Sequence, residues 1–205
     1  MKKITCLLLG LSLALCSCSR IIFRIMGLHE NKILDQKTIL AYSEKNKIPA
    51  ADNFRLDTTY LRFLKTVDTL RFAAERKNHY QPLQALYYDG NGTLRAFIIN
   101  CYTGGFPNLK WNRGKVLDTF LPGPQAPLDS ILPLYEHLKY LKPLPGAQRF
   151  SYGQNEYIII VYWSHFMGRQ GRRLIEAIKK NVKLAGNKKV RVIYVNTDNF
   201  FAKLN

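Results

Sequence analysis

The sequence has few cysteines, and their positions exclude a disulfide framework in the body of the chain. Four cysteines occur in 205 residues, at Cys6, Cys16, Cys18 and Cys101. Three of them lie within the first 18 residues, and Cys101 stands alone in the remainder. Residues 19–205 must therefore depend on their hydrophobic core instead of internal disulfides.

Catalytic and cofactor-binding motifs are also missing. The segment GRQGRR at 168–173 is neither a Walker A loop nor a GxGxxG fingerprint, which argues against nucleotide binding. Ser164 and His165 are adjacent, so their side chains would point apart on a strand end and would not form a triad. The histidines have no local ligand spacing, so we predict no metal and no cofactor. They are His29, His79, His137 and His165.

Acidic residues are scarce, and the positive charge is uneven. The chain has 31 Lys and Arg against 14 Asp and Glu, a net charge of +17. From Tyr157 onward there are ten basic residues and only two acids, a net charge of +8. Charge of this kind favours anionic partners such as nucleic acid, anionic lipid or lipopolysaccharide. A location outside the cytoplasm would disfavour nucleic acid as a partner and favour the lipids.

The N-terminus has the pattern of an export signal. Lys2 and Lys3 precede an apolar run from Ile4 to Cys16, which is shorter than the roughly twenty residues of a membrane span. The residues Leu15-Cys16-Ser17-Cys18 resemble the lipobox of bacterial lipoproteins, of the type found in Bacteroides. The resemblance implies a signal peptide at 1–17, a lipid on Cys18 and a mature chain of 188 residues with net charge +15. An uncleaved anchor extended through Ile21, Ile22 and Phe23 is the alternative, and Arg20 argues against it.

Residues 18–80 are predicted to form a tether followed by helices. Asp35 is placed to cap a helix that ends near Asn46, and Asp57 is placed to cap a longer one. The second helix would bury one apolar stripe. The stripe consists of Leu61, Leu64, Val67, Leu70 and Ala74.

Residues 81–205 are predicted to form an α/β domain that opens with a β-hairpin. The strands Leu83 to Tyr88 and Thr93 to Cys101 flank the turn Asp89-Gly90-Asn91-Gly92, whose glycines tolerate positive φ. Cys101 would be a small buried hydrophobic residue. The Gly- and Pro-rich residues 103–127 are predicted to be an ordered loop, and residues 128–141 a helix.

The closing stretch predicts a strand, a helix and a parallel strand. Tyr157 to Trp163 is a continuous apolar run, and a glycine-containing turn at 164–173 follows it. Residues 174–187 then have helical periodicity, and KKVRVIYVN at 188–196 is a second apolar strand.

This unit resembles the active-site region of thioredoxin-fold proteins. In that family a strand ends in tryptophan, and a CxxC pair begins four residues later at the start of a helix. Counting from Trp163, the two cysteine positions are Met167 and Gln170, and Gly168 matches the glycine that follows the first cysteine. A thioether cannot supply the thiolate that disulfide exchange requires, so the resemblance implies a redox-inactive domain. The family's closing hairpin is absent after residue 196, so the hairpin at 83–101 would have to supply those strands.

Three arginines follow the degenerate motif. Arg169, Arg172 and Arg173 fall at the start of the predicted helix, where free N–H groups and the helix dipole favour an anion. They are our candidate anion-binding residues.

We therefore expect an α/β, thioredoxin-like three-layer fold with extra N-terminal helices. The expected function is a non-catalytic binding or scaffolding module for a protein or anionic partner, anchored by lipid to the cell envelope and placed at the outer membrane facing the periplasm. The alternative is a thiol-dependent oxidoreductase or peroxidase that uses Cys101.

Overall fold

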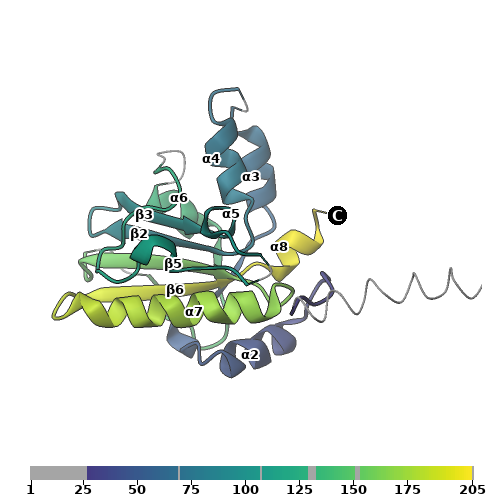
Figure 1. Cartoon of the computed structure of the whole chain (residues 1–205). Helices are drawn as coiled ribbons and strands as arrows, with labels where there is room; N and C mark the ends of the chain where they lie inside the picture. Colours follow the sequence, from purple (N-terminus) through teal and green to yellow (C-terminus); the bar gives the residue numbers. More distant parts are fainter. Residues whose placement is uncertain (1–26, 69, 107, 129–132, 151–152, 205) are drawn as a thin grey trace, which may run out of the picture.

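The computed structural model describes residues 27–68, 70–106, 108–128, 133–150 and 153–204. They form a mixed α/β structure around one six-stranded sheet (Figure 1). None of the helices in these ranges is long and apolar enough to cross a membrane. The predicted signal peptide, Cys18 and the tether up to residue 26 lie outside the described residues.

The strands and helices are interspersed along the chain. The strands are β1 Asn53–Leu56, β2 Gln84–Asp89, β3 Leu94–Ile99, β4 Leu141–Pro143, β5 Tyr157–Trp163 and β6 Val190–Asn196. The α-helices are α2 Gln36–Lys45, α3 Tyr60–Thr66, α4 Ala73–His79, α5 Asn100–Thr103, α6 Leu134–Lys139, α7 Gly168–Val182 and α8 Asp198–Ala202. Short 3₁₀ turns occur at η1 Ala50–Asp52, η2 Arg113–Lys115 and η3 Lys183–Ala185.

The sheet is centred on β5 and has the order β3-β2-β5-β6-β1-β4. β5 runs parallel to β6 from the pair Tyr157 and Val190 to the pair Trp163 and Asn196, which confirms the predicted strand, helix, strand unit. β2 and β3 pair antiparallel, which confirms the predicted hairpin. β2 also pairs antiparallel with β5, on the side of β5 opposite to β6.

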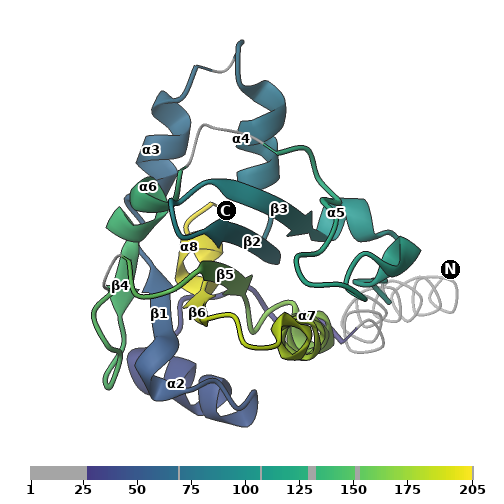
Figure 2. The ribbon, with the colours of Figure 1, turned by 90° about the vertical axis from the view of Figure 1, so that its left-hand side faces the viewer.

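Both faces of the sheet are covered, which explains why β5 is apolar at every position. Ile159, Val161 and Trp163 pack into one core with α2 and α7. Ile158, Ile160 and Tyr162 pack into the other with α3, α6 and α8. The two groups of helices lie on opposite sides of the sheet (Figure 2).

The N-terminal segment is only partly helical. Asp35 caps α2 as predicted, since its Oδ1 accepts the N–H of Thr38 at 2.6 Å. The expectation of helix throughout is wrong at β1, which pairs with β6 and with β4 and buries Phe54 and Leu56. A strand of four residues has too short a pattern to be recognised from sequence, and pairing with two neighbours stabilises it.

The long helix predicted after Asp57 is also wrong, because the chain breaks between α3 and α4. Asp68 Oδ1 accepts the N–H groups of Leu70 at 2.9 Å and Arg71 at 3.1 Å, and this turn competes with helix. Of the predicted apolar stripe, Leu64 is fully buried, whereas Leu70 is 95% exposed.

The predicted helix at 128–141 is shorter in the structure. α6 begins directly after Pro133 and ends at Lys139, and Leu141 already belongs to β4. Pro143 is tolerated in β4 because that strand lies at the sheet edge, where a missing N–H leaves no ladder bond unmade.

Two histidines lie buried in the core on the α3, α6 and α8 side. His137 is fully buried, and its Nδ1 lies 2.8 Å from the hydroxyl of Tyr162. The ring of His79 lies 5.4 Å from that of His137, and the rings of Tyr60 and Tyr88 are also close. Burial, assisted by His79, holds the pKa of His137 well below its ordinary value of 6.5.

This burial predicts acid sensitivity. The unfolded chain takes up a proton at His137 near pH 6.5, whereas the folded chain does so only at lower pH. The free energy of unfolding should therefore fall as pH is lowered from about 7 to about 5. In denaturant titrations, the unfolding free energy of His137→Gln should depend less steeply on pH than that of wild type. Tyr162→Phe, which keeps the titrating ring, should lower the unfolding free energy without changing its pH dependence. If His137→Gln kept the wild-type pH dependence, the assignment would be wrong.

Candidate functional site

The carboxyl ends of β5 and β6 meet at a buried carboxylate. Asp198 is 2% exposed, and its Oδ1 accepts the hydroxyl of Ser164 at 2.8 Å and the N–H of Phe166 at 3.0 Å. Its Oδ2 accepts the N–H of His165 at 2.8 Å and the amide of Asn196 at 2.6 Å. Four donors compensate the charge, so Asp198 shapes the turn after β5. Ser164 binds this carboxylate and does not pair with His165 as a nucleophile.

Met167 and Gln170, the positions at which the thioredoxin resemblance would place cysteines, are both buried. Met167 is 8% exposed and belongs to the core on the α7 side. Gln170 is fully buried, and its Oε1 accepts the N–H of Leu109 at 3.1 Å. Gln170 therefore holds the loop at 103–127 against the start of α7, and neither residue offers a reactive group to solvent.

The first described residues cover the start of α7. The carbonyl of Gly27 accepts the N–H of Arg169 at 3.2 Å, and the N–H of His29 donates to the carbonyl of Phe166 at 2.8 Å. Leu34 and Asn199 exchange two further hydrogen bonds, of 2.7 and 2.9 Å. Gly27 and His29 therefore lie against the start of α7, and Leu34 ties the same segment to α8.

His165 lies in a stack of three rings. Its ring centroid is 3.6 Å from that of Tyr42 and 4.3 Å from that of His29, with nearly parallel planes. Burial, followed by the effect of His29, lowers the pKa of His165 to about 4 against an opposing effect of Asp198. The imidazole is thus neutral at pH 7 and too weak a base for general base catalysis there.

The candidate arginines differ in their surroundings. Arg169 and Arg172 are exposed and Arg173 is half-buried, and the guanidinium of Arg169 donates to Asn108 Oδ1 at 3.1 Å. The first three N–H groups of α7 each bind a carbonyl, those of His165, Gly27 and Met167. An anion at these arginines would therefore be bound by side chains, without the backbone donors that the sequence suggested.

Cys101 is not the buried residue that the sequence predicted. It lies in α5, just after β3 ends at Ile99, and its side chain is exposed. Partial burial of the sulfur raises the pKa of the Cys101 thiol, and the charge of Lys77 opposes this with a smaller effect. A raised pKa keeps the thiol protonated at neutral pH, the opposite of what a catalytic cysteine needs.

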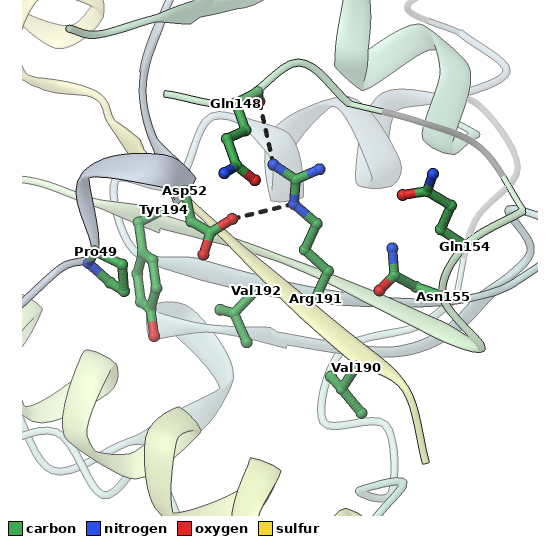
Figure 3. A pocket seen from close by; sticks show the side chains of 9 residues that line it. All are labelled: Pro49, Asp52, Gln148, Gln154, Asn155, Val190, Arg191, Val192 and Tyr194. Atoms are coloured by element: carbon green, nitrogen blue, oxygen red, sulfur yellow. Dashed lines mark hydrogen bonds and ion pairs between the residues drawn. The ribbon is translucent and has the colours of Figure 1, made fainter. Parts of the chain in front are cut away.

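A cleft of about 450 Å³ lies along the edge of β6 that faces β1 (Figure 3). It lies beside the first residues of β6, because β1 pairs only with residues 194–196. Arg191 crosses it, donating from Nε to Asp52 at 3.1 Å and from its terminal nitrogens to the carbonyls of Gln148 and Arg149. Burial and then Asp52 raise the pKa of Tyr194 to about 12. The cleft is lined by Pro49, Asp52, Gln148, Gln154, Asn155, Val190, Arg191, Val192 and Tyr194.

The sequence did not identify this cleft. Its residues come from three segments far apart in the chain, and an arginine between two valines in a strand is the one local signal. No group of three or more potential metal ligands occurs within the described ranges.

Gly168 should be intolerant of any side chain. Its φ is +47°, and a Cβ there would collide with the carbonyl oxygen of Gly27. Gly186 also has positive φ, at +62°, but open space around it. We expect Gly186→Ala to cost about 1 kcal/mol of unfolding free energy from backbone strain alone. Gly168→Ala should cost about 1–3 kcal/mol more, because residues 27–34 must move. Equal losses in chemical denaturation would show that the segment does not press on α7.

Arg191 should stabilise the fold through its part-buried ion pair with Asp52. Arg191→Met keeps much of the apolar stem but leaves Asp52 without this donor, whereas the two exposed carbonyls can bind water instead. We therefore expect a loss of about 1–2 kcal/mol in unfolding free energy. Arg95 is the matched control, since its 2.9 Å ion pair with Asp89 is more exposed. Arg95→Met should cost less than about 1 kcal/mol. Similar losses for both variants would refute a special role for Arg191.

Comparison with known proteins finds no matching family model, no matching curated protein and no matching solved structure.

Proposed function

We propose that this chain is a non-catalytic binding or scaffolding module with a thioredoxin-like layout. A lipid on Cys18 attaches it to the cell envelope, at the outer membrane facing the periplasm. Its partner is a protein or an anionic group.

The sheet supports the thioredoxin-like layout. β5 ends in Trp163, and α7 connects it to the parallel strand β6. The hairpin β2-β3 lies antiparallel on the other side of β5, so strands from earlier in the chain fill the place of the family's closing hairpin. β1 and β4 extend the sheet beyond β6.

The observation that carries the non-catalytic assignment is the hydrogen bond from Leu109 to the buried amide of Gln170. In a redox-active relative of this layout the second cysteine would stand at this position. Here the position holds a loop in place, and Met167 is part of the core. The turn retains a structural role without a group that could exchange electrons.

Two surfaces suit the two kinds of partner. The cleft along β6 presents the side-chain amides of Gln148, Gln154 and Asn155, which can both donate and accept hydrogen bonds with a polar segment of a protein. Arg169, Arg172 and Arg173 suit an anionic group at the start of α7.

The competing function is thiol chemistry at Cys101, and the exposure of its side chain is the observation in its favour. The raised pKa of the thiol opposes this function. Cys101 is also the only cysteine among the described residues; with residues 1–17 removed and Cys18 lipidated, as proposed, a resolving thiol would have to come from a second molecule.

Activity assays on the full chain separate the two functions. We expect insulin reduction and peroxide consumption by wild type to equal the uncatalysed rates, and Cys101→Ala to behave identically. Cys101→Ser serves as the control for unspecific effects of the substitution. Turnover by wild type that both variants abolish would overturn the non-catalytic assignment.

A further inference from the structure

The helical hairpin α3-α4 projects from the sheet as an arm (Figures 1 and 2). At its tip Leu70 is 95% exposed, more than any other large hydrophobic residue in the described ranges. Val67 and Phe72 lie beside it in the sequence and are only half-buried. Single exposed apolar side chains are common on protein surfaces, so Leu70 is informative only together with its position at the tip and the charge around it.

Asp68 binds Leu70 and the two residues that follow it at the tip. Its Oδ1 accepts the N–H groups of Leu70 and Arg71, and the N–H of Phe72 donates to its carbonyl at 3.0 Å. These bonds hold residues 70–72 against Asp68, while the side chain of Leu70 stays in solvent. They also engage the one carboxylate at the tip.

The arm is basic around this leucine. Residues 60–79 contain five Lys or Arg and two acids, a net charge of +3. Lys65 and Arg71 are exposed near the tip, and the guanidinium of Arg71 lies over the ring of Phe72 at 4.9 Å. The arm therefore combines one projecting apolar residue with exposed cations.

This combination fits a lipid surface better than a protein surface. Protein interfaces bury a broad apolar core from which charged residues are depleted. Interfacial membrane contacts instead insert a few apolar side chains between headgroups, while lysine and arginine bind the phosphates.

We propose that the tip of the arm inserts Leu70 into an anionic lipid surface, with Lys65 and Arg71 contacting the headgroup phosphates. The proposal rests on the membrane location given above and adds a second point of contact to the lipid on Cys18. Two contacts would hold the body in one orientation at the membrane, whereas a single lipid on a tether would let it rotate.

The test places a fluorescent reporter at the tip. Full-length Leu70→Trp is mixed with vesicles of phosphatidylglycerol and phosphatidylethanolamine whose acyl chains carry bromine, which quenches tryptophan within the bilayer. Leu184→Trp is the control, because Leu184 is another exposed leucine, 52% accessible, in η3. The native Trp111 and Trp163 are buried and give a constant background.

We expect quenching of Leu70→Trp to exceed that of Leu184→Trp by at least about twofold, and to weaken in phosphatidylcholine vesicles. Adding Lys65→Gln and Arg71→Gln should weaken it further. Adding Arg172→Gln and Arg173→Gln, which removes the same charge from α7, should weaken it less. Equal quenching of the two reporters, or an equal effect of the two charge variants, would overturn the proposal. A blue shift of Leu70→Trp without vesicles would also overturn it, since that would show contact between copies.

A separate measurement distinguishes failure of the anchor from failure of the arm. Cells that express the wild-type chain or Cys18→Ala are labelled with palmitate. Quenching of Leu70→Trp without label on the wild type would keep the arm contact and refute the lipid anchor. Label that depends on Cys18, with equal quenching of the two reporters, would keep the anchor and refute the arm.

Discussion

The buried carboxylate of Asp198 organises the end of the sheet where function was expected. Its two oxygens bind donors from the turn after β5 and from the end of β6. An unpaired carboxylate would be very costly at 2% exposure, so the turn is held in the one conformation that supplies these donors. That conformation places His165 between two aromatic rings and starts α7 at Gly168.

The same constraint explains why Met167 and Gln170 offer no reactive group to solvent. With α7 fixed, Met167 points into the core and Gln170 faces the loop that it holds. Residues 27–34 then close the helix start from outside, through Gly27 and His29. The first three N–H groups of α7 and the hydroxyl of Ser164 already bind internal acceptors, and the guanidinium of Arg169 binds Asn108.

The extent to which sequence predicted this structure depends on element length and on where each element's partners lie. The hairpin and the β5-α7-β6 unit were predictable because each has a long pattern and a clear turn. β1 and β4 were not, since four and three residues carry no period and their stability comes from pairing with each other and with β6. The break at Asp68 is a local contest between a side-chain turn and helix, which the apolar spacing concealed. Cys101 follows a buried strand, and only the turn into α5 exposes it.

The candidate surfaces, too, were predictable from the sequence only in part. Residues at the α7 turn were predictable because they are contiguous, and their burial was not, because it depends on Leu109 and Gly27 from distant segments. The β6 cleft exists because β1 pairs only with the last residues of β6 and leaves the first ones without a neighbouring strand on that side. Arg191 lies on this unpaired part of β6 and binds Asp52. A charged side chain across an open strand edge blocks pairing with another chain. This arrangement favours recognition through the amide side chains around the cleft over addition of a strand, and it leaves the arm as the one described element that projects an apolar residue fully into solvent.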